Sequence, residues 1–378
     1  MKVVTVVGTR PQLIKAAALQ PVLRASHREV LVDTGQHWDE GMAGAFFAEL
    51  GLARPDHSLG IGGGRHGDQT GRMLVALEPV LEAERPDAVI VFGDTNSTLA
   101  GAIAAAKLGL PLAHVEAGLR SHDRRMPEEI NRVVADHLAT WCLAPTPTAV
   151  ANLAAEGIGA GVVMTGDLMQ DLASRTLDEV RDGPAELARI GARHGLDGLV
   201  PGGYLFATVH RAENRSTTAV AAWTAILAAA AIDRPLILAL HPGTQAAIGA
   251  AGIALPDRIR VVEPLGYRTT LALELHAAAV LTDSGGIQRE AAWLDVPCLV
   301  LRDTTEWIEA VAGSSGRMVV VGLDADRALA ALARIAPSDV SPAAAVRRAA
   351  EVRLGPSGAA SAIVAALTGP MAGPGSRR

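Results

Sequence analysis

Carboxylates gather in the first half of the chain at places where an acid has little structural reason to lie. Asp94 follows the apolar run VIVFG, and Glu116 interrupts the end of another apolar run in LAHVEAG. A charge at the end of a buried strand is costly unless it is paired or used in chemistry. Glu128 comes soon afterwards in MPEEINR, and His210 follows a third apolar run in YLFATVH. Held near one another, such groups could remove a proton from a substrate and return it.

The same acids have a structural alternative. Glu129, the second acid of the EE pair, is expected to be a solvated acid on a helix face. The remaining carboxylates could form an ion-pair network, whose basic partners would be Arg120, Arg124, Arg125 and Arg132.

Turns with unusually polar sequences follow several apolar runs, at residues 8–11, 93–97, 210–214 and 283–286. In the last of these, Ser284 is expected to cap a helix that begins with Gly285 and Gly286, which would let a phosphate approach bare backbone N–H groups. Arg10 and Arg211 could each bind phosphate through two hydrogen bonds. Further along the same helix, Glu290 could reach a pair of ribose hydroxyls. A helix cap without a ligand is the alternative for this turn.

These residues require elements that present them at one edge of a sheet. Residues 87–118 and 278–306 repeat one design: an apolar strand, an acidic turn with small hydroxyl residues, a short helix and a second apolar strand. A chain that builds this βαβ unit twice is predicted to have two doubly wound parallel-sheet domains, Rossmann-like α/β folds that face one cleft.

The pattern of apolar runs divides the chain into two series. Strands are predicted at 2–8, 29–35, 88–93, 112–117, 141–145 and 161–166, and again at 204–210, 236–242, 259–265, 278–283, 297–302 and 316–322. Helices are predicted at 11–25, 42–50, 168–194, 218–231 and 341–367, of which the last could pack on either domain. The predicted domains are 1–168, with the carboxylates, and 169–367, with the turn expected to bind a phosphate; 368–378 is predicted to be a frayed tail.

Composition excludes several classes of protein. The 378 residues are 49% hydrophobic and 20% charged, as in a soluble globular protein, and the net charge of −6 comes with no basic stripe for nucleic acid. There is no run of about 18 apolar residues, so we expect a cytoplasmic protein with no membrane partner. Cys142 and Cys298 lie in apolar runs and are expected to be core residues. The histidines show no paired spacing, so no metal is expected.

The chain resembles the non-hydrolysing UDP-N-acetylglucosamine 2-epimerases and close relatives that act on other UDP-2-acetamido sugars. The matching blocks include GTRPQLIKAAAL, TGQHWDEGM, GDTNST, HVEAGLRS, MPEEINR, TVHRAENR, EPLGY, TDSGGIQREA and PCLVLRDTTE. The resemblance implies a glycosyltransferase-B-like fold and a homodimer. It also implies inversion at C2 of the sugar, by anti elimination of UDP to a 2-acetamidoglucal and re-addition of UDP. No external cofactor is implied, because UDP itself leaves and returns.

Carried onto this sequence, the resemblance assigns roles to residues. The acid–base and stabilising groups would be Asp94, Glu116, Glu128 and His210. The UDP and substrate contacts would be Arg10, Arg211, His241, Ser284, Gly285, Gly286 and Glu290. An activator site for a second UDP-sugar would involve Gln36, His37 and Gln69, with Arg211 and His241 as further candidates. Asp39 stands where bacterial members that bind this activator have an amide, which leaves the activator site open.

Two other departures from the family pattern leave the sugar open. Many members read TERPE and QEEA where this chain has residues 305–309 (TEWIE) and 288–291 (QREA). The first hypothesis is interconversion of UDP-GlcNAc and UDP-ManNAc for envelope polysaccharide or aminosugar natural products. The alternatives are C2 epimerisation of UDP-2,3-diacetamido-2,3-dideoxy-glucuronic acid, a hydrolysing epimerase that releases ManNAc and UDP, a glycosyltransferase on the same fold, and a UDP-sugar sensor without catalysis.

Overall fold

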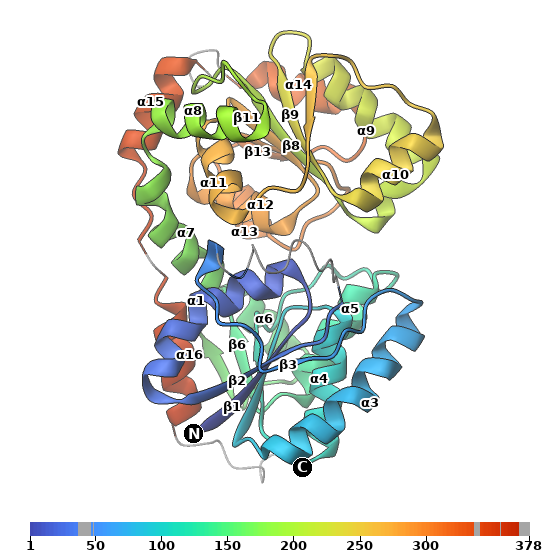
Figure 1. Cartoon of the computed structure of the whole chain (residues 1–378), viewed down its shortest axis with the longest axis vertical. Coiled ribbons are helices and arrows are strands. Elements are labelled where there is room, and N and C mark those ends of the chain that lie inside the picture. Colours follow the sequence, from blue (N-terminus) through green and yellow to red (C-terminus); the bar gives the residue numbers. More distant parts are fainter. Residues whose placement is uncertain (37–46, 48, 336–340, 356, 370–378) are drawn as a thin grey trace. The chain divides into compact units, whose positions relative to one another are not determined.

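The structure is a computed structural model that describes residues 1–36, 47, 49–335, 341–355 and 357–369. The chain forms two compact units. Unit 1 consists of Met1–Leu172 and Pro356–Arg378, and unit 2 of Ala173–Gly355 (Figure 1). The chain therefore leaves unit 1 once and returns to it for its last helix.

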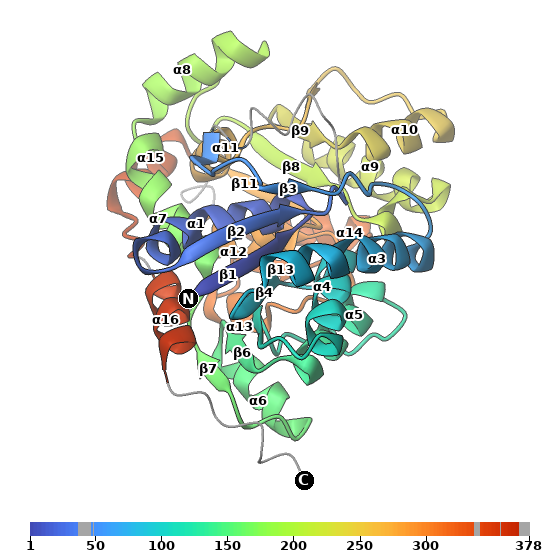
Figure 2. The same cartoon turned by 60° about the horizontal axis from the view of Figure 1, so that its bottom comes forward.

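A parallel sheet with the order β3-β2-β1-β4-β5-β6-β7 forms the centre of unit 1. Its strands are β1 (Lys2–Val7), β2 (Arg28–Asp33), β3 (His57–Ser58), β4 (Ala88–Phe92), β5 (Leu112–Val115), β6 (Trp141–Ala144) and β7 (Val162–Met164). Helices α3 (His66–Glu84), α4 (Asn96–Lys107) and α5 (Pro127–Leu138) pack side by side, and α1 (Arg10–Ser26) packs against α16 (Ala359–Thr368) (Figure 2). Helix α6 (Pro147–Ala155) lies against β6 and β7, and α7 (Leu168–Val180) begins in unit 1 and ends in unit 2.

Local sequence explains where the helices of the site begin. Thr9 and Gln12 form a capping box at the start of α1, and Pro11 occupies its first turn, where a missing N–H costs nothing. The side chain of Thr95 accepts a hydrogen bond from the backbone N–H of Thr98 at the start of α4. These caps fix the turns that follow β1 and β4.

Unit 2 is built on a second parallel sheet, with the order β10-β9-β8-β11-β12-β13. The strands are β8 (Leu205–Val209), β9 (Leu236–Leu240), β10 (Ile259–Val262), β11 (Ala279–Thr282), β12 (Cys298–Val300) and β13 (Met318–Val320). The helices are α8 (Gly183–His194), α9 (Thr217–Ala230), α10 (Pro242–Ala251), α11 (Tyr267–His276), α12 (Gly285–Trp293), α13 (Ile308–Gly313), α14 (Ala325–Arg334) and α15 (Pro342–Glu351), with a short 3₁₀ turn at Ala212–Arg215.

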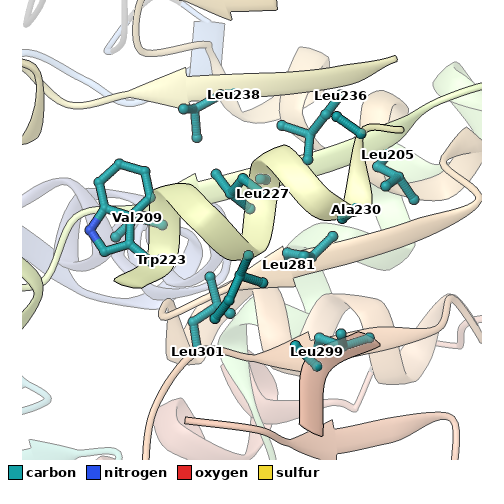
Figure 3. Packing of buried hydrophobic residues seen from close by; sticks show 14 of the residues in the cluster. Leu205, Val209, Trp223, Leu227, Ala230, Leu236, Leu238, Leu281, Leu299 and Leu301 are labelled. Atoms are coloured by element: carbon teal, nitrogen blue, oxygen red, sulfur yellow. The ribbon is translucent and has the colours of Figure 1, made fainter. Parts of the chain in front are cut away.

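The core of unit 2 lies between α9 and the sheet. Trp223 and Leu227 of α9 pack with Leu238, Leu281 and other strand residues (Figure 3), and both α9 side chains are completely buried. The indole N–H of Trp223 donates to the carbonyl of Asn214 at 3.0 Å, which satisfies its one polar group. This core supports the turns that follow β8 and β11.

The predicted α/β class with two doubly wound parallel sheets is confirmed, and each predicted strand is present. Strand β3 was not predicted, because two residues are too few to show alternation. The predicted helix at 42–50 falls mostly on residues outside the described ranges, as does most of the predicted tail. Cys142 and Cys298 are buried, as expected. No helix in the described ranges is both long and apolar enough to cross a membrane.

Two of the predicted helices are wrong in extent. The segment 168–194 forms α7 and α8, with a break before Gly183. The segment 341–367 forms α15 and α16, which belong to different units. Glycine and proline in the sequence RLGPSG interrupt the second segment, and α16 begins after Gly358, which has a φ of 75° that glycine adopts without strain.

Candidate active site

Each sheet presents its polar turns at the same topological position. In unit 1 they follow the neighbouring strands β1 and β4, and in unit 2 they follow the neighbouring strands β8 and β11. The strand order reverses between these neighbours, and ligands of doubly wound sheets bind at such a switch point. The two repeated stretches correspond to β4-α4-β5 and β11-α12-β12, so the structure confirms that one design is used twice.

Gly93 brings Glu116 against the turn that carries Asp94. A Cβ atom on Gly93 would lie 3.2 Å from Oε2 of Glu116 and 3.4 Å from Nζ of Lys15, and the φ of Gly93 is +60°. Lys15 of α1 forms an ion pair with Glu116, and the two side chains are only 7% and 10% exposed. Within unit 1, the structure therefore places Glu116 against the turn that carries Asp94 and adds a cation.

The backbone of Glu116 is strained. Its φ is +72°, in the left-handed region that costs a non-glycine residue about 1–3 kcal/mol. The conformation is held by hydrogen bonds from the N–H groups of Glu116 and Ala117 to the carbonyl of Leu143, at 3.0 and 3.2 Å. Strain of this kind gathers at functional sites, where surrounding contacts over-determine the geometry.

Asp94 is held from helix α5. Its carboxylate forms an ion pair with Arg132, and its carbonyl accepts a hydrogen bond from the side chain of Asn131 at 2.9 Å. Arg132 also pairs with Glu129 at 2.9 Å. Glu128 lies half-buried in the first turn of the same helix.

The prediction that Glu129 is a solvated acid is wrong. Glu129 is 2% exposed and accepts hydrogen bonds from the backbone of Ser121 and His122, at 2.9 and 3.0 Å, in addition to the Arg132 pair. Its carboxylate fixes the loop that precedes α5. The sequence EE does not show which of the two acids is buried. Glu129 points into the protein, whereas Glu128, one position earlier on the helix, is only half-buried.

The ion-pair alternative describes part of unit 1. Arg132 does reach Asp94, as that alternative required. Arg120 pairs instead with Asp136 and Glu156, and Arg125 pairs with Asp123 on the surface. The cation beside Glu116 is Lys15, which lies about a hundred residues earlier, so no local pattern revealed it.

The amides proposed for an activator site contact the start of α4. Oε1 of Gln36 accepts hydrogen bonds from the N–H and hydroxyl of Ser97, at 2.9 and 2.7 Å. Oε1 of Gln69 accepts a hydrogen bond from the side chain of Asn96 at 2.8 Å. Both glutamines therefore support the turn after Asp94. His37 and Asp39 lie outside the described residues.

In unit 2, Asp283 organises both polar turns. Its carboxylate lies 3.1 Å from Nδ1 of His210 and accepts hydrogen bonds from the backbone N–H of Arg211 at 3.0 Å and the side chain of Asn214 at 2.8 Å. Burial alone would raise the pKa of Asp283, but these donors outweigh it and hold that pKa well below the ordinary range. Asp283 is thus an anion that orients His210, whose side chain is 46% exposed.

Helix α12 begins at this point with its N-terminus capped by Ser284, which accepts a hydrogen bond from the backbone N–H of Ile287. A Cβ atom on Gly285 would lie 3.0 Å from Oε1 of Glu306 and 3.0 Å from Nε1 of Trp307. Arg211 donates to the carbonyl of Asp283 at 3.2 Å and pairs with Glu306 at 3.3 Å. Ser284, Gly285 and Arg211 therefore meet at one helix start, which is suited to an anion.

The two departures from the family pattern contact each other. The guanidinium of Arg289 stacks on the ring of Trp307 at 3.9 Å from its centroid, and Nε of Arg289 lies 3.4 Å from the carbonyl of Gly285. The hydroxyl of Thr305 donates to Oε1 of Gln288 at 2.6 Å. The QREA and TEWIE segments thus form one packed unit beside the helix start.

The remaining predicted contacts are spread over these elements. Arg10 is the first residue of α1 and is half-buried, and His241 caps α10 by accepting from the N–H of Gly243 at 3.2 Å. Gly286 follows Gly285 in α12. Glu290 is 3% exposed, and it lies close enough to the completely buried Glu274 to affect its titration. In the described ranges, no group of three or more His, Cys, Asp or Glu residues is arranged to hold a metal ion.

Known proteins match this chain over most of its length. A family model described as UDP-N-acetylglucosamine 2-epimerase matches residues 22–368. A UDP-2,3-diacetamido-2,3-dideoxy-D-glucuronate 2-epimerase of Pseudomonas aeruginosa is 43% identical over 336 residues, 86% of this chain and 90% of the relative. A UDP-N-acetylglucosamine 2-epimerase homolog of Methanococcus maripaludis is 41% identical over 344 residues, 89% of this chain and 93% of the relative.

A solved structure shares the fold over nearly the whole chain. The UDP-GlcNAc 2-epimerase of Methanocaldococcus jannaschii, solved in complex with UDP-GlcNAc and UDP, superposes with a TM-score of 0.85 at 36% identity and covers 97% of this chain and 99% of its own. The fold is thus glycosyltransferase-B-like. With its two switch-point sites and this extent of similarity, the chain belongs to the UDP-N-acetylglucosamine 2-epimerase family.

Proposed function

We propose that the chain catalyses the reversible C2 epimerisation of UDP-N-acetylglucosamine to UDP-N-acetylmannosamine without hydrolysis. The route is anti elimination of UDP to a 2-acetamidoglucal, followed by re-addition of UDP. The observation that carries this proposal is the contact of Glu116, paired with Lys15, against the turn of Asp94. A capped helix start suited to a phosphate, at Ser284, supports it.

The chemistry needs proton transfer on both faces of C2. In elimination, a carboxylate takes the C2 proton, the C–H electron pair forms the C1–C2 double bond, and the C1–O bond breaks with its electrons on UDP. In the return, the C2 proton is delivered to the opposite face while UDP re-adds at C1. Two faces require at least two groups, and we assign this acid–base work to three carboxylates, those of Asp94, Glu116 and Glu128.

Departure of UDP requires positive charge and hydrogen-bond donors at the diphosphate. We assign these to the N–H groups at the start of α12, to Arg211, to Arg10 and to His210. His210 is suited to the leaving diphosphate because Asp283 engages its Nδ1, which directs Nε2 away from the carboxylate. His241 and Glu290 complete the proposed UDP contacts. No further cofactor enters this scheme, since UDP is both the leaving group and the returning nucleophile.

One alternative substrate has an observation in its favour. The Pseudomonas aeruginosa relative that is 43% identical is named for UDP-2,3-diacetamido-2,3-dideoxy-D-glucuronate. The same elimination and re-addition would apply to that sugar, because the reacting atoms C1 and C2 are shared. The two candidate sugars differ at C3 and C6, so the choice of substrate depends on the residues that contact those two positions.

Incubation with each UDP-sugar, followed by proton NMR, tests the proposal. UDP-N-acetylglucosamine should convert to a mixture with UDP-N-acetylmannosamine and give no free sugar. Release of free N-acetylmannosamine and UDP would indicate the hydrolysing reaction, and turnover of the diacetamido sugar alone would select the alternative substrate. Binding of both sugars with neither one epimerised would overturn the proposal.

The activator site and the homodimer belong to the proposal as well. The amide oxygens of Gln36 and Gln69 already accept hydrogen bonds from Ser97 and Asn96. An activator bound to these glutamines would have to leave those hydrogen bonds in place or replace them. Turnover of UDP-N-acetylmannosamine, measured with and without a trace of UDP-N-acetylglucosamine, decides whether an activator is required. A lag that the trace removes supports the site, and equal rates from time zero contradict it.

A further inference from the structure

A cluster of four charged groups, three of them buried, lies in unit 1 beside the segments that carry Asp94 and Glu116. Its members are His114 in β5, Arg120 in the loop after β5, Asp136 in α5 and Glu156 after α6. The side chains of His114 and Asp136 are completely buried and that of Arg120 is 1% exposed. The proposed chemistry gives these groups no role, and of the four only Arg120 was considered from the sequence, as a possible ion-pair partner of the acids.

The ring of His114 ties two strands together where the acids emerge. Its Nε2 lies 2.7 Å from the carbonyl oxygen of Gly93, the residue before Asp94. Its Nδ1 lies 2.6 Å from Oδ1 of Asp136. His114 itself stands two residues before Glu116. It therefore belongs to the segment that carries Glu116, and its side chain contacts the segment that carries Asp94.

Asp136 holds the other side of Glu116. Its Oδ2 accepts a hydrogen bond from the backbone N–H of Gly118 at 3.1 Å and pairs with Arg120 at 2.8 Å. The segment of Glu116 is therefore fixed at both ends, by His114 before it and Gly118 after it, through a single carboxylate. These contacts lie on both sides of Glu116, whose strained backbone needs such support to persist.

The hydrogen bonds define the protonation of the cluster. The Gly93 carbonyl can only accept, so Nε2 of His114 must donate to it. Oδ2 of Asp136 pairs with Arg120, which is always charged, and accepts from the backbone N–H of Gly118, so this carboxyl is ionised. An ionised carboxylate also only accepts, so Nδ1 must donate as well, and the ring carries both protons. Two cations and two carboxylates then balance, with Glu156 bonded to Arg120 at 2.7 Å through both oxygens.

We propose that Asp136, acting through a doubly protonated His114, is a positioning residue of the reaction that sets where Asp94 and Glu116 stand relative to each other. The inference rests on the proposed function and extends it to residues that do not touch substrate. Its physical basis is that misplacing a reacting group by about 1 Å can cost about a hundredfold in rate.

Substitution of Asp136 by Asn tests the proposal, because it keeps the size of the side chain and removes the charge. We expect kcat to fall about 10- to 100-fold, while KM changes less than about threefold, since the UDP contacts proposed above are not altered. Asp123→Asn is the matched control: Asp123 lies in the loop that carries Arg120 and also pairs with an arginine, Arg125, but that pair is on the surface. It should keep the kcat of the unchanged protein.

His114 offers a second and independent pair of variants. His114→Gln keeps an N–H donor that can reach the Gly93 carbonyl, whereas His114→Leu has none, so Gln should recover at least about tenfold of the kcat that Leu loses. In the unchanged protein labelled with ¹⁵N, both ring N–H protons of His114 should be visible and slow to exchange. This spectrum decides the protonation even where a variant does not fold.

The outcomes separate this inference from the proposed function. If the unchanged protein epimerises no UDP-sugar, the proposed function fails first. If it does turn over and folded Asp136→Asn matches Asp123→Asn in kcat, the positioning role is wrong. Equal loss in both His114 variants, or a ring with only one N–H, would overturn it as well.

Discussion

Buried acids in this chain are held in opposite charge states, and the difference lies in their immediate neighbours. Asp283 is surrounded by donors from His210, Arg211 and Asn214, so its pKa lies below the ordinary range. Glu274 is equally buried, yet neither of its oxygens has a hydrogen-bond partner among the described residues. Burial raises the pKa of Glu274 well above its ordinary value of 4.5, and the charge of Glu290 adds to the effect. Glu274 is thus a neutral acid beside a proposed ribose contact.

Substitution of Glu274 by Gln should stabilise the protein in a pH-dependent way. Above about pH 4.5 the unfolded chain loses the Glu274 proton while the folded protein keeps it, so stability falls as pH rises, by up to about 1.4 kcal/mol per pH unit. Gln cannot ionise and escapes this loss. Urea unfolding at pH 8 should therefore give Glu274→Gln the higher midpoint, and the two proteins should converge near pH 4.5. A lower midpoint for Gln at pH 8 would contradict the neutral state.

Substitution of Glu116 by Gln should reduce kcat by about two to four orders of magnitude, the usual range for a lost acid–base group. The amide keeps the size of the side chain and removes the charge that Lys15 faces. Glu78→Gln, an exposed acid on α3, is the control and should leave kcat unchanged. Initial rates by proton NMR provide the measurement, and near-normal activity of Glu116→Gln would reject its role.

At the scale of elements, the start of α12 depends on the absence of a side chain. Gly285→Ala would place a Cβ atom 3.0 Å from both Glu306 and Trp307, so those residues or the helix must shift. We expect UDP to bind at least about tenfold more weakly by calorimetry, because the backbone N–H groups can no longer present the same geometry. Gly249→Ala in α10 meets nothing within 4 Å and should bind UDP normally while gaining about 0.5–1 kcal/mol of stability. Equal affinity of the two variants would contradict the proposed phosphate site.

Strands and turns could be predicted from the sequence where the signals that define them lie within one strand-to-helix turn. Apolar runs followed by Gly-Asp-Thr or Asp-Ser-Gly gave strands β4 and β11 and the polar turns after them, because caps and turns are local signals. Lys15 and Glu129 were misjudged or missed, since their roles depend on which helix face meets a distant strand. The Arg289–Trp307 stack was visible only as two separate departures from a pattern.

At the scale of the whole molecule, the chain builds the same six-strand order twice, with a seventh strand, β7, added in unit 1, and then returns its last helix to unit 1. Helix α16 packs against α1, the helix that carries Lys15, and against β6. Its Ile363 is completely buried. Unit 1 therefore depends on residues that follow the whole of unit 2 in sequence.

Ile363→Ala should lower the free energy of unfolding by about 2–5 kcal/mol, as expected for a large-to-small change in a core. Ile130→Ala, also in unit 1 but 50% exposed, should change it by less than about 0.5 kcal/mol. Urea unfolding of both variants tests whether α16 is part of the core of unit 1. Equal stability of the two would show that it is not.

The account as a whole depends on proton transfer at C2, and turnover of UDP-N-acetylglucosamine in heavy water tests this most directly. The account predicts that NMR will show deuterium at C2 of the UDP-N-acetylmannosamine product, because the group that protonates the glucal has exchanged with solvent. An epimerised product that retains its original hydrogen at C2 through many turnovers would contradict the assignment of Asp94, Glu116 and Glu128 as the acid–base groups.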